Sequence, residues 1–213
     1  MVDVTAPTAT GINRSLLYVA EFQHRISNEY MKVISFVCRE VALSSTPEVK
    51  GALLKVIEHL HASAELHYKL RPPLPGELVD FTVDMAELCN LFALAGPAQQ
   101  GISVHVATSG SAMLDGIRSW YGSLIVAELM TNSLRHACSA GGKRICVGIK
   151  TDGSDVVCQI SDDGTSAATV VKPGVGSQLI DALADELQGR ITRSYTKSGA
   201  AVALCFPIKP EQY

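Results

Sequence analysis

The first third of the chain has the hydrophobic pattern of a long amphipathic helix. No proline or glycine occurs between Arg14 and Leu43, and apolar residues recur there at spacings of three and four. This periodicity predicts one helix with a single apolar stripe along it. The stripe consists of Val19, Phe22, Ile26, Tyr30, Val33, Val37 and Val41.

A second helix is predicted directly after the break at Ser44-Ser-Thr-Pro47. Thr46 suits the N-cap position and Pro47 suits the first helical position. The helix should run to about Leu70, and two helices alone bury too little apolar surface to be stable. Pairing with a second copy in a four-helix bundle is therefore expected. The predicted inner face consists of Leu53, Val56, Leu60, Ala64 and His67.

The pattern changes after Arg71-Pro-Pro-Leu-Pro-Gly76, which cannot continue a helix. Helical and alternating segments then follow each other, which predicts an α+β sandwich with helices on one face of a mixed sheet. The expected division is a tail over 1–13, a helical hairpin over 14–73 and a second domain over 74–213. Gly189 is expected to cap a helix in the left-handed conformation. Helices are predicted over Glu77–Leu94, Asp115–Ala137 and Ser177–Leu187, and strands over Ile102–Ala107, Arg144–Lys150, Asp155–Ile160, Arg190–Thr196 and Ala200–Phe206.

Composition narrows the class of protein. Hydrophobic residues make up 47% of the chain, charged residues 18%, and the formal charge is −3. This is a globular balance with no basic field that would attract nucleic acid. No signal peptide or membrane-spanning apolar run is visible, so a cytoplasmic protein without a membrane partner is expected. The six scattered cysteines form no C-x-x-C pair and are expected to be small buried hydrophobes.

His24 is the first candidate for chemistry. It lies roughly 150° around the helix from the centre of the apolar stripe and should point away from the core. Glu21 and Asn28 lie three residues before it and four after it, within side-chain reach. The Glu21 carboxylate could accept the Nδ1–H of His24 and leave Nε2 as the nucleophilic nitrogen. The competing interpretation is an exposed helix histidine without a role.

A second group of polar residues, Glu128, Asn132 and His136, recurs every four residues along one helix face. The amide oxygen of asparagine suits a hard cation such as magnesium, and a glutamate can act as a general base. The alternative is the solvated face of an amphipathic helix.

The third group combines the turn Asp162-Asp163-Gly164 with the loop Gly174-Val-Gly176, which precedes a predicted helix. Backbone N–H groups in such a loop can hold phosphate. Each group alone would favour a structural explanation, but their order along the chain is hard to obtain by chance.

These motifs resemble those of two-component histidine kinases, in the subgroup whose phosphoacceptor box reads H-R-x-x-N. The box is His24-Arg25-Ile-Ser-Asn28, and Glu128–Ala137 is similar to the N box of the family. Asp162–Gly164 and Gly174–Gly176 look like its two glycine boxes. The resemblance covers nearly everything from Arg14 to Ile208. It implies a dimeric helical hairpin followed by the GHKL-type ATP-binding sandwich.

The resemblance also implies an enzyme that autophosphorylates His24 with ATP and Mg²⁺ and transfers the phosphoryl group to an aspartate of a response-regulator receiver domain. By the family pattern Glu128 assists the transfer and Asn132 holds magnesium through the nucleotide. Asp162 would bind the adenine amino group. Glu21, Arg25 and Asn28 would support phosphotransfer, and His136, Gly164, Gly174 and Gly176 would complete the nucleotide site.

Three departures from the family pattern keep other functions open. Ser166 replaces the last glycine of D-x-G-x-G, the lid segment Thr165–Lys172 is short, and Gly199-Ala200 replaces a common Gly-Thr pair. Only 23 residues precede His24, so an input domain is not expected. One alternative is a histidine phosphotransferase that relays phosphate between receiver domains without using ATP. Another is a GHKL-type regulator that sequesters a partner, although such a regulator needs no phosphoacceptor histidine.

Overall fold

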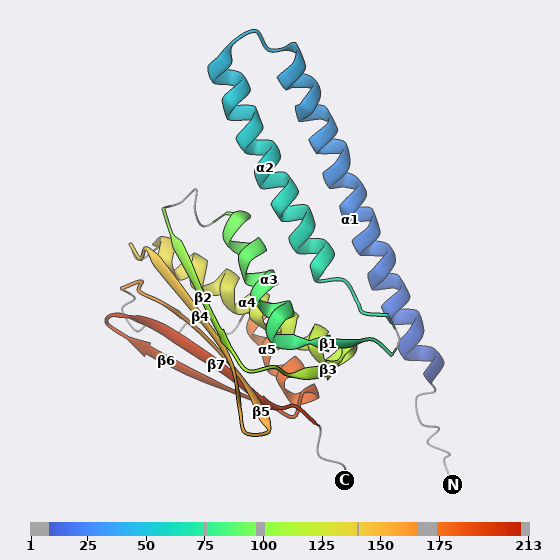
Figure 1. Cartoon of the computed structure of the whole chain (residues 1–213), viewed down its shortest axis with the longest axis vertical. Helices are drawn as coiled ribbons and strands as arrows, with labels where there is room; N and C mark the ends of the chain where they lie inside the picture. Colours follow the sequence, from blue (N-terminus) through green and yellow to red (C-terminus); the bar gives the residue numbers. More distant parts are fainter. Residues whose placement is uncertain (1–8, 75, 97–100, 140, 166–173, 210–213) are drawn as a thin grey trace. The chain divides into compact units, whose positions relative to one another are not determined.

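The computed structural model describes residues 9–74, 76–96, 101–139, 141–165 and 174–209 (Figure 1). The chain forms two compact units, Met1–Pro72 and Pro73–Tyr213. Within the described ranges, no helix combines the length and the apolar character that crossing a membrane requires.

The first unit is a hairpin of two helices, α1 (Ala9–Leu43) and α2 (Pro47–Lys69). Thr46 takes the predicted N-cap position before Pro47 but makes no side-chain capping bond. Ile34 and Val37 of α1 are buried, as is Ala62 of α2. The helical hairpin predicted from the periodicity is therefore confirmed.

The predicted apolar stripe of α1 is only partly covered by α2. Val37 is buried, but Phe22 is 63% exposed and Val33 is 46% exposed. On α2, Val56 is exposed as well, although it was expected on the inner face. The apolar surface of α1 is broader than one partner helix can cover, because its apolar residues spread beyond the face that contains Ile34 and Val37.

The second unit is built on a five-stranded sheet in the order β2-β4-β5-β7-β6 (Figure 1). β2 pairs parallel to β4, and the other three neighbouring pairs are antiparallel. The mixed sheet predicted from the sequence is therefore confirmed, and both hairpins fall where alternation placed them. The strands are β2 (Ser103–Ser109), β4 (Arg144–Asp152), β5 (Asp155–Asp162), β6 (Arg190–Thr196) and β7 (Gly199–Pro207).

Three helices cover one face of this sheet: α3 (Phe81–Leu94), α4 (Gly116–Ser139) and α5 (Val175–Glu186). Alternate strand residues are buried beneath them, which gives the sheet one core face and one open face. The largest fully buried side chains of this core include Phe81, Leu88, Ile125, Ile149, Ile160 and Leu204.

A short two-stranded ribbon replaces part of the helix predicted over Glu77–Leu94. β1 (Leu78–Asp80) pairs antiparallel with β3 (Met113–Asp115). The Asp80 side chain then accepts a hydrogen bond from Thr82 N at 3.1 Å and caps α3. Asp115 accepts from Arg118 N at 3.0 Å at the start of α4. Strands of three residues carry no usable periodicity, so the sequence pattern merged them with the helices that follow.

The predicted left-handed cap at Gly189 is wrong. Gln188 takes the left-handed conformation, with φ 55°, and ends α5. Gly189 is instead required by close packing, because a Cβ there would lie 2.9 Å from both the Cys205 carbonyl oxygen and the Phe206 Cβ. The prediction that the cysteines are buried is also only partly correct. Cys89, Cys158 and Cys205 are buried, whereas Cys38 and Cys146 are exposed.

Candidate functional site

His24 is exposed on α1, as predicted. Its Nδ1 lies 3.5 Å from the side-chain amide of Asn28, one helical turn later. The Glu21 carboxylate was expected to contact this nitrogen, but that prediction is wrong. Glu21 Oε1 accepts a hydrogen bond from Arg25 Nε at 2.9 Å. A guanidinium at i+4 is a stronger partner for a carboxylate than a neutral imidazole at i+3.

Asn28 therefore holds the position next to Nδ1 of His24. The two ends of an asparagine amide exchange by a half-turn about one bond, so the group can present its oxygen to a ring N–H. With the oxygen turned to Nδ1, the proton resides on Nδ1 and Nε2 keeps its lone pair. This is the tautomer that a nucleophilic histidine needs.

In the second unit, Glu128 and Asn132 lie one turn apart on α4 and are half-buried. Asn132 Nδ2 donates to Glu128 Oε1 at 3.3 Å. Val126 and Met130, on the opposite side of the helix, are fully buried in the core and fix its rotation. The side chain of His136, the third predicted member of this face, lies outside the described residues.

The first turn of α5 packs against this pair. A Cβ added to Gly176 would collide with Oε1 of Glu128, whereas Gly174, the N-cap residue, has open space around it. The two glycines were predicted to act together in holding phosphate. The structure separates their roles, because only Gly176 is required by contact with Glu128.

Asp162 lies at the end of β5 and is 8% exposed. Its Oδ1 accepts a hydrogen bond from Gly164 N at 3.1 Å, so the carboxylate shapes the turn that contains the first glycine box. Gly199 has φ 139°, and a Cβ there would collide with the Asp162 carbonyl oxygen. Ala200, which replaces a threonine common in histidine kinases, is the register partner of Asp162 in the β5–β7 pair.

Asp163 has a positioning role that the sequence analysis missed. Its Oδ1 accepts from Lys143 N at 2.8 Å and from Arg144 N at 2.9 Å, and thereby ties the start of β4 to the glycine-box turn. The bonds from Arg144 N and then Lys143 N hold the pKa of Asp163 below its usual value. Gly142 belongs to the same contact, because a Cβ there would lie 2.8 Å from Gly164 N. The adjacent aspartates in the sequence could have indicated this role, but the family pattern assigns a function only to Asp162.

The second unit thus brings together two groups of predicted residues. Glu128, Asn132 and Gly176 form one, and Asp162 and Gly164 form the other. Ser166 and most of the short lid segment lie outside the described residues. The chemistry of the first group fits a nucleotide-bound magnesium ion, because Glu128 engages the amide nitrogen of Asn132 and the oxygen is the end that prefers a hard cation.

No protein-family model matches the chain. Over 152 residues it is 26% identical to the sensor histidine kinase PdtaS of Mycolicibacterium smegmatis. This match covers 68% of the chain but 29% of that kinase, so the chain spans less than a third of the relative's length.

Two solved structures have a similar fold over almost the whole chain. One is the histidine kinase domain of a blue-light activated histidine kinase from Erythrobacter litoralis, with a TM-score of 0.54 and 17% identity over 94% of this chain and 96% of that one. The other is a bacterial phosphotransferase, with a TM-score of 0.57 and 12% identity over 96% of this chain and 100% of that one. The similarity to histidine kinases expected from the motifs is therefore confirmed, and the helical hairpin followed by an ATPase-like α/β domain is the fold of this chain.

Proposed function

We propose that this chain is a two-component phosphotransfer enzyme that phosphorylates His24 with ATP and passes the phosphoryl group to a receiver-domain aspartate. The observation that carries the proposal is the arrangement Glu128–Asn132–Gly176. All three positions match family motifs, and Glu128 meets both of the others although Gly176 is 48 residues from it in the sequence. A domain that retained the fold without the activity would not require a residue without a side chain at position 176 next to the Glu128 carboxylate.

The residues around this arrangement support a nucleotide site. Asn132 would offer its amide oxygen to magnesium, and backbone N–H groups at the start of α5 would face phosphate. Asp162 would accept a hydrogen bond from the adenine amino group, with its turn held in shape by Gly164 N and Asp163. Magnesium–ATP, when bound, supplies the phosphoryl group that His24 accepts.

His24 and Asn28 do the chemistry on the hairpin. The exposed imidazole offers the Nε2 lone pair, and Asn28 keeps the proton on Nδ1 while the new N–P bond forms. The Arg25–Glu21 ion pair is exposed, and its two side chains bind each other rather than the imidazole. A phosphohistidine on an open helix face is accessible to the aspartate of a receiver domain, which is the partner we propose.

A second candidate function is favoured by Ala200. A threonine at this position would place a hydroxyl opposite Asp162, and alanine removes that polar group from the adenine side of the proposed site. The fold is also similar to that of a bacterial phosphotransferase over nearly the full length of both chains. Under this second proposal, His24 relays phosphate between two receiver domains and the α/β domain does not use ATP.

We also propose that two copies pair through the hairpin. At 100° per residue, several exposed apolar residues of α1 fall on one side of the helix, next to the face that meets α2. A second copy would cover them in a four-helix bundle. These residues are Tyr18, Phe22, Val33, Phe36 and Leu43. We propose that the protein acts in the cytoplasm.

One experiment decides between the two functions. The chain is incubated with γ-labelled ATP and magnesium, and separately with a phosphorylated receiver domain. ATP-dependent labelling that is lost in His24→Ala and retained in His61→Ala, an exposed histidine of α2, supports the enzyme. Labelling of His24 by the phosphorylated receiver alone supports the relay. Labelling that persists at the wild-type rate in His24→Ala would contradict both.

A further inference from the structure

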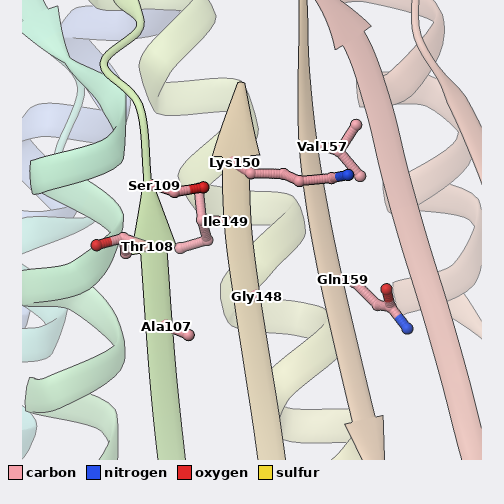
Figure 2. Close-up of a pocket in the computed structure, with 8 residues that line it drawn as sticks. All are labelled: Ala107, Thr108, Ser109, Gly148, Ile149, Lys150, Val157 and Gln159. Atoms are coloured by element: carbon pink, nitrogen blue, oxygen red, sulfur yellow. The ribbon is translucent and has the colours of Figure 1, made fainter. Parts of the chain in front are cut away.

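The open face of the sheet carries a hollow of about 250 Å³ that the proposed phosphotransfer function does not use. Strand register explains where it lies. Ala107, Gly148 and Gln159 lie side by side on β2, β4 and β5, and Ser109, Lys150 and Val157 form the next row. The hollow opens over Ala107 and Gly148, because these two neighbouring positions have almost no side chain. Figure 2 shows them on adjacent strands, with Lys150 extending across β5 to Val157.

Gly148 has no structural reason to be glycine. It lies inside a strand that has partners on both sides, and it does not adopt a positive φ. A Cβ at this position would meet nothing within 4 Å. Glycine inside a strand costs stability relative to residues with side chains, and it commonly marks a place where a ligand or another backbone approaches closely. The open space above Gly148 is the space of the hollow itself.

The charge at the hollow selects the kind of ligand. Lys150 is the one formally charged side chain among the eight residues that line it. Its ammonium group lies 3.7 Å from Asp152, but both side chains are more than half exposed, so this ion pair is weak and can be replaced. Ser109 adds a hydroxyl in the same row as Lys150. The floor beside them is the flat backbone of β4 with the methyl group of Ala107, which suits a planar apolar group.

We infer that this hollow binds a small organic monoanion with a flat apolar body, such as an aromatic carboxylate. The ring would lie on the backbone at Gly148, and the carboxylate would pair with Lys150. The volume lies just below the usual range of ligand sites, about 300–1,000 Å³, which limits the ligand to a single ring. This inference does not depend on the proposed phosphotransfer function, because none of the lining residues belongs to the site around Glu128 and Asp162.

The test uses benzoate as the probe, with the full chain followed by amide chemical shifts. Benzoate should shift Ala107, Gly148 and Val157 in a saturable manner. Benzyl alcohol, which has the ring without the charge, should bind about two- to fivefold more weakly, the range expected for one exposed charge pair. Lys150→Gln should weaken the binding of benzoate by the same factor. Arg190 is an exposed cation on β6 outside the hollow, so Arg190→Gln should leave the affinity unchanged.

Gly148→Val should abolish saturable binding while the chain stays folded, because the added side chain enters open space and valine favours strands. Thr192→Ile on β6 adds bulk to an exposed strand position outside the hollow and should not affect binding. Unsaturable shifts in the wild type, equal binding of benzyl alcohol, or unchanged binding by Gly148→Val or Lys150→Gln would each overturn the inference. Shifts of the same residues on dilution without benzoate would make the face a contact between copies and would also overturn it.

Discussion

The carboxylate of Glu128 lies directly over the backbone of Gly176, so that any side chain at position 176 would displace it. Asn132 Nδ2 donates a hydrogen bond to the same oxygen, Oε1, at 3.3 Å. Glu128 is thus positioned by two partners, one on its own helix and one on the first turn of α5. This contact gives the second glycine box a role in placing a carboxylate as well as in approaching phosphate.

Gly176→Ala should therefore reduce ATP-dependent labelling of His24 with little loss of stability. The Glu128 side chain is flexible and can swing away, so the fold tolerates the methyl group while the carboxylate leaves its place. Gly174→Ala is the matched control, since its Cβ would meet open space. Both variants are compared by thermal unfolding and by labelling rate. Labelling by Gly176→Ala at the rate of Gly174→Ala and the wild type would show that the position of Glu128 does not matter.

Asn28 should control the reactivity of His24. Asn28→Ala removes the group beside Nδ1, so the proton is no longer held there and labelling should slow by about 10- to 100-fold, as when a functional histidine loses the group that fixes its tautomer. Asn28→Asp keeps an acceptor at the same place and should retain more activity than the alanine variant. Glu21→Gln should have a smaller effect, because Glu21 is engaged with Arg25. The rates are measured with the donor that labels the wild type, and a larger loss in Glu21→Gln than in Asn28→Ala would contradict the assignment.

The contrast between Glu21 and Asn28 shows what the sequence could predict. Both residues fall on the same side of the helix as His24, and spacing alone does not decide between them. Asn28 rather than Glu21 lies beside Nδ1 of His24, because Arg25, four residues after Glu21, binds the Glu21 carboxylate. The competition between His24 and Arg25 for the Glu21 carboxylate involves three side chains at once. The periodicity that predicted the helices depends only on which face of the helix each residue occupies.

The roles of Asp163 and Gly199 could not be predicted from the sequence because they depend on tertiary contacts. The role of Asp163 depends on Lys143 and Arg144, which are about twenty residues earlier and reach it only through the pairing of β4 with β5. The clash that requires Gly199 likewise involves a backbone oxygen of another strand. Long elements with a clear period were predictable, but contacts between elements required the register of the sheet.

Asp163 should contribute stability in a pH-dependent manner. Its pKa is lowered in the folded chain from an ordinary value of 3.8, so the carboxylate binds fewer protons when folded. Its stabilising contribution is present above that ordinary value and is lost as the pH falls through the lowered one. Asp163→Asn should be less stable than the wild type near neutral pH, and the difference should narrow below about pH 4. Urea unfolding across this range measures the effect, with Asp185→Asn, exposed on α5, as the control.

A threonine at position 200 should improve nucleotide binding if the enzyme function is correct. Ala200→Thr places a hydroxyl on the strand position opposite Asp162, and one added hydrogen bond raises affinity by about two- to tenfold. Ala201→Thr puts the same group on the opposite face of β7 and should change nothing. Calorimetry with magnesium and an adenine nucleotide gives both affinities. No measurable binding by the wild type or by Ala200→Thr, together with normal labelling from a phosphorylated receiver, would establish the relay function instead.

In the proposed dimer, the exposed apolar side of α1 that includes Phe22, Val33 and Phe36 is where a substitution should most affect dimerisation. Phe36 is 56% exposed and lies on the same side of the helix as Phe22 and Val33, so a charge there would be buried against the second copy. Phe36→Glu should give a monomer by light scattering at micromolar concentration, because an unpaired carboxylate is costly in an apolar contact. Ser35→Glu introduces the same charge one residue away, on a different side of α1, and should remain dimeric. A dimer that tolerates Phe36→Glu would move the interface off this apolar side of α1, and a wild-type monomer would remove the four-helix bundle from the proposal.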